Sequence, residues 1–300
     1  MDLYIVTGHT KGLGRALVEQ LGREPDIELI ALGRAADGPI PGGAQLFVDL
    51  ALPRAVEAVC DRIEERLRGK RFEKAVLVNN AGVISPVGML DRVDASELER
   101  SLAVNFAAPI LLMRRFLIAM ATAAKVKRVI NISSGAARRP YFGWGAYCAA
   151  KAGLDMISRV AALEAQTAMT GVQVASLAPG VIDTPMQGVV RSASPEEFVD
   201  VERFRAMKAK GELRPPEEVA ADILRLEKSG KLFAEPIADL RTLGACSSTR
   251  SSTRWPFPPC CSWACPRAAS AAALASWPRR SWRSPCRRRR PRPSCCPSCW

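Results

Sequence analysis

The sequence predicts an α/β fold in which helices cover both faces of a doubly wound parallel sheet. Short apolar runs alternate with longer amphipathic stretches up to Leu243, an order typical of repeated strand–helix–strand units. A glycine-rich turn follows the first apolar run and begins the first amphipathic stretch. Neither an internal repeat nor a linker precedes Gly244, so we assign residues 1–243 to a single domain.

Six apolar runs have the length and composition of buried strands. They are Leu3–Val6, Glu28–Leu32, Ala44–Val48, Lys74–Asn79, Arg128–Ile132 and Val172–Ala178. Pro236–Leu240 is a candidate for a last strand at the edge of the sheet. Helical periodicity predicts the elements between the strands. These helices are expected at Gly12–Leu21, Ala55–Arg68, Ser96–Ala121, Ala146–Ala168, Pro195–Ala209 and Pro216–Glu227.

The composition changes abruptly after Gly244. Residues 245–300 have no Asp, Glu, Lys, Ile, Val, Met, Asn, Gln, Tyr or Gly, but they contain eleven Arg, eight of the ten Cys and five of the six Trp. Of the net charge of +13, only +2 therefore belongs to residues 1–244. The isoelectric point of 9.6 is a property of this tail.

We predict that the tail, residues 244–300, is disordered, because it has too few aliphatic residues to offset the loss of chain entropy on folding. Its restricted residue set is typical of GC-rich DNA read in a wrong frame, and we interpret it as a frameshift or read-through product. The alternative is that the arginines Arg287–Arg290, with aromatics interleaved nearby, bind nucleic acid or an anionic membrane. We expect neither partner.

Cysteine and histidine usage excludes other classes of protein. The domain has only Cys60 and Cys148 and no secretory leader, so we expect a reducing cytoplasm. No apolar run approaches the roughly 20 residues that span a bilayer. The single histidine, His9, excludes a Ser-His-Asp hydrolase and argues against a His-based zinc site, so no metal is expected. His9 is expected to be a spacer in the glycine-rich turn.

The glycine-rich turn is the run TGHTKGLG, Thr7–Gly14. Gly8, Gly12 and Gly14 permit a tight turn and a close approach to a pyrophosphate, which the free N–H groups and the positive end of the helix dipole would bind. Thr7 and Leu13 belong to the same predicted cofactor site. Glycine-rich turns also join ordinary strands and helices, so this motif alone is a weak signal.

The next strand ends at Arg34, where a dinucleotide-binding fold usually has an acidic residue that binds the NAD ribose. A cation at this position suits the 2′-phosphate of NADP(H), and Lys11 is expected to add a second positive charge. Asp49, after the third strand, is predicted to accept a hydrogen bond from the adenine amino group. The alternatives are that both cations are ordinary surface residues and that Asp49 is an acid at a helix N-terminus.

Tyr147 and Lys151 are four residues apart, so on a helix they share one face and can converge on one substrate atom. A neighbouring ammonium stabilises a phenolate, so Lys151 is expected to lower the pKa of Tyr147. Tyr147 would then protonate a carbonyl oxygen as a nicotinamide delivers hydride, and the hydroxyl of Ser134 would polarise that oxygen.

Several motifs follow one another along the chain: NNAG at Asn79–Gly82, then Asn105, and then Ser134 thirteen residues before the Tyr-x-x-x-Lys pair. Their order resembles that of the short-chain dehydrogenase/reductase family. The resemblance covers almost all of residues 1–243 and implies a Rossmann fold. It also implies that Lys151 binds the nicotinamide ribose and that Asn105 orders a water that relays protons to it.

The family pattern implies further cofactor contacts. Pro179 and Gly180 are expected to turn the chain beneath the nicotinamide, and Val181–Thr184 to contact its carboxamide. Asn80, Ala81 and Gly82 are expected to hold the central sheet and to flank the adenosine. Family members usually associate through their long helices, so a homodimer is expected.

Within the family, three segments resemble benzil reductases and sepiapterin-reductase-like proteins. They are Met186 and Gln187 after the run DTP, the helix at Pro195–Ala209 and the ending IADLRTL. The substrate is therefore expected to be a small carbonyl compound. Tyr141, Phe142, Trp144 and Met186 could form an apolar pocket for an aryl ketone or diketone, or simply pack as loop and core. Two alternatives remain open: a binding protein that senses NADP(H) without chemistry, and an enzyme acting on 3-oxoacyl thioesters.

Overall fold

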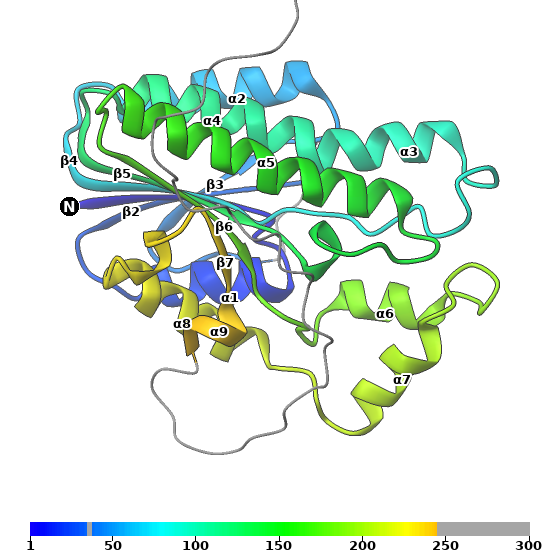
Figure 1. The fold of residues 1–300 in the computed structure, drawn as a ribbon. Helices are drawn as coiled ribbons and strands as arrows, with labels where there is room; N and C mark the ends of the chain where they lie inside the picture. Colours follow the sequence, from blue (N-terminus) through cyan, green and yellow to red (C-terminus); the bar gives the residue numbers. More distant parts are fainter. Residues whose placement is uncertain (35–37, 245–300) are drawn as a thin grey trace, which may run out of the picture. The chain divides into compact units, whose positions relative to one another are not determined.

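The computed structural model describes residues 1–34 and 38–244, so the predictions for the tail lie outside the described residues. Seven parallel strands form one sheet with helices on both faces (Figure 1). The strands are β1 (Asp2–Thr7), β2 (Ile27–Gly33), β3 (Gly43–Phe47), β4 (Phe72–Asn79), β5 (Ala124–Ile132), β6 (Val172–Ala178) and β7 (Ile237–Asp239). Their spatial order is β3-β2-β1-β4-β5-β6-β7, all in parallel register. The predicted doubly wound sheet is confirmed.

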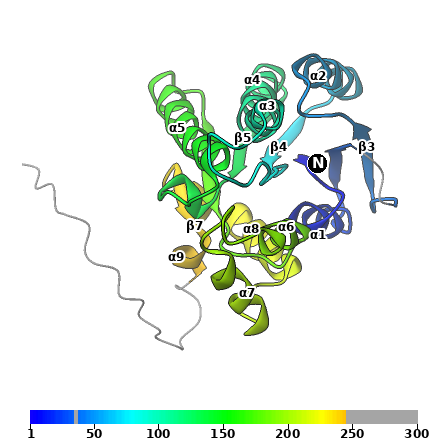
Figure 2. The same ribbon diagram turned by 90° about the vertical axis from the view of Figure 1, so that its right-hand side faces the viewer.

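Two layers of helices cover the sheet (Figures 1 and 2). One layer contains α1 (Gly12–Leu21), α8 (Pro216–Lys228) and the short α9 (Leu240–Gly244). The other contains α2 (Pro53–Leu67), α3 (Ala95–Leu102), α4 (Ala108–Met120) and α5 (Gly145–Thr167). Because both faces are covered, the central strands are buried nearly throughout and carry apolar residues without strict alternation.

The helix predicted at Ser96–Ala121 is interrupted. Its α-helical ends, α3 and α4, are joined by a π-helical turn, η1 (Ala103–Ala107), which contains Asn105. Pro109 has no backbone N–H and cannot donate to the carbonyl of Asn105, which favours such a local widening. By length and composition the whole stretch Ala95–Met120 is apolar enough to cross a membrane, which the sequence reading overlooked. In the structure Leu112 and Phe116 of this stretch are buried against the sheet, as in a core helix.

The prediction of one helix at Pro195–Ala209 was wrong in its start. Two short helices stand in this region, α6 (Pro185–Ser192) and α7 (Val201–Ala209), beyond the carboxyl ends of the strands (Figure 1). Ser194 and Glu197 bond to each other's backbone N–H groups in the turn between them. This local pairing offers the backbone an alternative to the helix.

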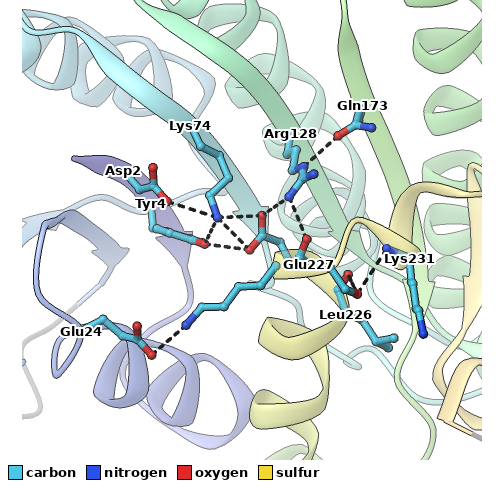
Figure 3. A network of polar contacts seen from close by, with 11 residues as sticks. Asp2, Tyr4, Glu24, Lys74, Arg128, Gln173, Leu226, Glu227 and Lys231 are labelled. Carbon is cyan, nitrogen blue, oxygen red and sulfur yellow. Dashed lines mark hydrogen bonds and ion pairs between the residues drawn. The ribbon is translucent and has the colours of Figure 1, made fainter. Parts of the chain in front are cut away.

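A buried ionic network joins α8 to the sheet near the amino ends of the strands (Figure 3). The carboxylate of Glu227 is fully buried and accepts hydrogen bonds from the Tyr4 hydroxyl at 2.7 Å and from Arg128 at 2.8 Å. Nζ of Lys74 lies 3.2 Å from Oε1 of Glu227 and completes the network. Burial beside this carboxylate raises the pKa of Tyr4. The network is thus structural and lies opposite the carboxyl ends of the strands.

Candidate active site

The predicted site residues meet at the carboxyl ends of β1, β4, β5 and β6. Strand order reverses between β1 and β4, and ligands of open α/β sheets bind at such a switch point. The glycine-rich turn follows β1, NNAG ends β4, Ser134 follows β5, and Pro179 and Gly180 follow β6.

The backbone of the glycine-rich turn requires its glycines. Gly8 has a φ of +74° and Gly12 a φ of +57°, conformations that favour glycine. A Cβ on Gly14 would lie 2.1 Å from the carbonyl oxygen of Gly8, so only glycine lets α1 pack this closely. The N-cap Lys11 makes no side-chain cap bond. The first N–H groups of α1, at Gly12 and Leu13, therefore suit an anion.

Thr7 and the NNAG motif hold the end of β4 beside this turn. The Thr7 hydroxyl accepts hydrogen bonds from the N–H groups of Asn80 and Ala81, both at 2.9 Å. The Asn80 amide donates to the carbonyls of Thr7 and Gly8 at 2.9 and 3.3 Å. These contacts support a structural role for NNAG at the edge of the cofactor site.

The ring of His9 is fully buried rather than a spacer in the turn. Its Nε2 lies 3.4 Å from the side-chain oxygen of Gln45. A Cβ on Gly33 would lie 2.8 Å from Cε1 of His9, so the ring packs directly against β2. His9 thus supports the turn from beneath.

The two predicted cofactor cations, Lys11 and Arg34, are exposed, and the side chain of neither has a hydrogen-bond or ion-pair partner among residues 1–34 and 38–244. Asp49 is already engaged, since its carboxylate accepts from the N–H of Ala51 at 3.0 Å and lies 3.5 Å from Arg100. The Asp49 carboxylate therefore has two partners that the sequence did not indicate. The adenine contact stays a prediction.

Lys151 and Tyr147 occupy one face of α5, as their spacing predicted. Lys151 is 4% exposed, and its Nζ donates to the carbonyl of Ile132 at 2.8 Å. The same nitrogen lies 5.8 Å from the centre of the Tyr147 ring. Ser134, just after β5, is hydrogen-bonded to Tyr147 and accepts from the N–H of Ala136 at 3.2 Å. The three predicted catalytic residues therefore converge.

Burial dominates the ionisation of this pair. It raises the pKa of Tyr147 to about 12, against the lowering effect of the Ser134 hydrogen bond. Burial lowers the pKa of Lys151 to about 8, against the raising effect of Asp155. The prediction that Lys151 lowers the pKa of Tyr147 was wrong for this structure. The ammonium bonds to the Ile132 carbonyl, and desolvation of the phenolate outweighs its influence.

The side chain of Asn105 is fully occupied. Its oxygen accepts from the N–H of Val83 at 2.9 Å, and its amide donates to the Val83 carbonyl at 2.8 Å and to Ser101 at 3.2 Å. The side chain therefore fixes the segment after NNAG. Because the π-helical turn and Pro109 loosen the bonding of its backbone carbonyl, that carbonyl is the group of Asn105 suited to a water.

The segment after β6 closes the site from the other side. Gly180 has a φ of +87°, and Val181 and Asp183 pair with Arg214 through backbone bonds of 3.3 and 2.9 Å. Thr184, the N-cap of α6, makes no side-chain cap bond, and its Cγ2 would lie 3.0 Å from a Cβ on Gly12. The N-termini of α1 and α6 thus face each other.

Gly82 packs closely beside Lys151. A Cβ on Gly82 would lie 3.0 Å from Oδ1 of Asn105, 3.7 Å from Nζ of Lys151 and 3.9 Å from Cε of Met186. Glycine here therefore lets these three side chains approach the backbone after β4 closely. Together with the two helix N-termini, these features fit a nicotinamide dinucleotide, with its pyrophosphate at Gly12 and its nicotinamide end near Gly82 and Lys151.

An aromatic cluster borders Tyr147. The ring of Trp144 stacks on Phe198 at 4.5 Å and meets the ring of Tyr147 edge-on at 5.8 Å. Tyr141 and Met186 pack against the same cluster. Phe142, by contrast, is 44% exposed. The predicted apolar residues are thus mostly brought together, while Phe198 comes from a segment that the sequence reading did not link to the site.

Comparisons with known proteins agree with this geometry. Residues 3–195 match the model of the short chain dehydrogenase family. The benzil reductase ((S)-benzoin forming) of Bacillus subtilis (strain 168) is 38% identical over 231 residues, which cover 77% of this chain and 95% of that protein. The sepiapterin reductase of Rattus norvegicus is 32% identical, covering 70% and 84%. The crystal structure of the KRED1-Pglu enzyme is similar with a TM-score of 0.66 at 28% identity, covering 75% and 94%.

Proposed function

Because this chain belongs to the short-chain dehydrogenase family, we propose that it reduces a small ketone or diketone to the alcohol, with NADPH as cofactor and Tyr147 as proton donor. The observation that carries this proposal is the convergence of Ser134, Tyr147 and Lys151 close to Gly82 at the carboxyl ends of the strands. A non-catalytic sensor of NADP(H) has no need for this arrangement.

When bound, the nicotinamide supplies the hydride. Tyr147 gives its phenolic proton to the carbonyl oxygen, and its raised pKa keeps the phenol protonated at neutral pH. The Ser134 hydroxyl donates a hydrogen bond to the same oxygen. The Lys151 ammonium, whose Nζ lies 5.8 Å from the centre of the Tyr147 ring, would bind the ribose of the nicotinamide.

The preference for NADPH rests on Lys11 and Arg34. Both are exposed cations whose side chains have no hydrogen-bond or ion-pair partner within the described part of the chain, and we expect them at the adenosine end of the site. The 2′-phosphate of NADPH would give both charges a partner, which NADH lacks.

Apolar side chains near Tyr147 favour an aryl ketone or diketone as substrate. Trp144, Tyr141 and Met186 belong to one apolar cluster beside Tyr147. The similarity to a benzil reductase supports the same class. Pterins and 3-oxoacyl thioesters are the competing substrates.

Oxidation of NADPH by the full chain, followed at 340 nm with benzil, aryl ketones, pterins and acyl thioesters, tests this proposal. We expect turnover with benzil-type diketones and aryl ketones and little with thioesters. Cofactor binding without turnover of any carbonyl compound would instead favour the sensor.

We also propose a homodimer in a reducing cytoplasm. Met156, Val160 and Leu163 lie three and four residues apart on α5 and are exposed, so they form an apolar stripe that a second copy would cover. Light scattering at micromolar concentration tests this: only monomer in the wild type would contradict it.

A further inference from the structure

A buried carboxylate lies one turn beyond Lys151 on α5. Asp155 is 7% exposed, and its Oδ1 accepts hydrogen bonds from the hydroxyls of Ser133 at 2.6 Å and Ser176 at 2.7 Å. Its Oδ2 lies 3.6 Å from Nε of Arg138. One side chain of α5 therefore binds groups that follow β5 and groups within β6.

The partner Ser133 has catalytic neighbours on both sides. Ile132 before it provides the carbonyl that accepts from Lys151, and Ser134 after it is hydrogen-bonded to Tyr147. A bond from Asp155 to Ser133 thus fixes the end of β5 relative to the helix that carries Tyr147 and Lys151. If this bond lengthened, Ser134 would move relative to Tyr147 and Lys151.

We propose that Asp155 is a positioning residue of the active site, which holds Ser134 and the Ile132 carbonyl in register with Tyr147 and Lys151 and stabilises the ammonium of Lys151. This inference rests on the proposed function. Asp155 acts through its neighbours, since its own carboxylate is held by Ser133, Ser176 and Arg138.

The charge of Asp155 also affects Lys151 through space, without a direct contact. Burial lowers the pKa of Lys151 to about 8, and the nearby carboxylate opposes this effect. Three neutral groups also lie near Lys151 in the described part of the chain: the phenol of Tyr147, the amide of Asn105 and the Ile132 carbonyl. Arg138 lies 3.6 Å from Asp155 and also 3.6 Å from Asp239. Removing the carboxylate charge should therefore lower the pKa of Lys151 further.

Asp155→Asn removes the charge and keeps an oxygen that can accept from a serine. We expect kcat to fall about tenfold with KM nearly unchanged, and the alkaline limb of the kcat profile to move down by about one pH unit, a tenfold change in an acid dissociation constant. NMR titration of the Lys151 Cε signal, assigned by its loss in Lys151→Arg, should show the same shift in the protein without cofactor. That titration reports on Asp155 even if no carbonyl compound is reduced.

Glu227→Gln is the matched control, because it neutralises another fully buried carboxylate at the opposite ends of the strands (Figure 3). It should lower stability but leave both the alkaline limb and the Lys151 titration in place. Equal losses of kcat in the two variants, with no pH shift in either, would reduce Asp155 to an ordinary structural residue and overturn the proposal.

Ser176→Ala covers the case in which Asp155→Asn fails to fold. It removes one hydrogen bond to the carboxylate and leaves the charge, so kcat should fall about threefold while the alkaline limb stays in place. A Ser176→Ala enzyme with wild-type kcat would contradict the positioning role.

Discussion

Burial shifts the pKa values of Tyr147 and Lys151 in opposite directions. Tyr147, with a pKa of about 12, is a neutral phenol at pH 7, whereas Lys151, with a pKa of about 8, is mostly an ammonium. A protonated phenol beside a cation suits the donation of a proton, which is the direction of carbonyl reduction. Oxidation of an alcohol would require the phenolate instead.

Tyr147→Phe tests the proton donor. The substitution removes the phenolic hydroxyl and retains the ring against Trp144, so we expect turnover to fall at least about a hundredfold while cofactor affinity stays close to that of the wild type. Steady-state kinetics and fluorescence titration measure the two quantities. Retention of more than about a tenth of the turnover would rule out Tyr147 as the donor.

Lys151→Met tests the cost of burying the ammonium. The folded-state pKa of Lys151 is depressed to about 8, so between pH 8 and 10 the unfolded chain binds more protons than the folded one, and stability rises with pH. From pH 7 to pH 10 the wild type should gain roughly 2–3 kcal/mol in the free energy of unfolding relative to the variant. Urea unfolding at both pH values checks this, and parallel changes in the two proteins would contradict it.

Arg34→Asp tests the cofactor preference. Charge-assisted hydrogen bonds contribute roughly 1.5–3 kcal/mol each, so Lys11 and Arg34 together can account for a preference of about a hundredfold or more. The aspartate would repel the 2′-phosphate and accept from the ribose hydroxyls of NADH, so the preference should reverse. The measure is kcat/KM for both cofactors. Equal wild-type values, or a variant that still favours NADPH, would show that Arg34 is an ordinary surface cation.

At the scale of the element, the glycine-rich turn and α1 act as one unit. A Cβ on Gly14 would lie 2.1 Å from the Gly8 carbonyl and 2.4 Å from the Asn80 amide. Gly14→Ala should therefore displace the turn, abolish cofactor binding and lower the melting temperature. Isothermal calorimetry and thermal unfolding measure both effects.

Gly188→Ala provides the control within α6, because nothing lies within 4 Å of the added Cβ. It should raise stability by about 0.5–1 kcal/mol, since alanine favours a helix. If both variants bound the cofactor equally well, the close packing at Gly14 would have no part in binding.

At the scale of the whole molecule, the cores on the two faces of the sheet are assembled from segments far apart in sequence. Among residues 1–34 and 38–244, Leu243 is the last that packs against the cluster between α1, α8 and the sheet. A chain that ends at Leu243 should therefore fold and keep its activity, with a free energy of unfolding within about 1 kcal/mol of that of the full chain. Urea unfolding and kinetics of both chains test this. Loss of folding on truncation would show that residues 244–300 contribute to the core.

Local spacing was enough to predict most elements and the shared helix face of Tyr147 and Lys151. The six main strands were placed to within one or two residues at most ends, although β5 begins four residues before the predicted start. These features depend on local backbone geometry, because the helical and extended periodicities decide which residues share a face of a helix or strand, independently of distant contacts. The spacing of Tyr147 and Lys151 by four residues belongs to the same kind of information.

Contacts between distant segments were decided only by the tertiary structure. The bonds from Asn105 to Val83 and from Ser176 to Asp155, and the stacking of Phe198 on Trp144, join residues at least 20 positions apart. The raised pKa of Tyr147 has the same origin, because desolvation depends on everything packed around the phenol. The spacing of residues in the sequence determined which side chains lie on the same face of an element. Tertiary packing determined the ionisation state and the contact partners of those side chains.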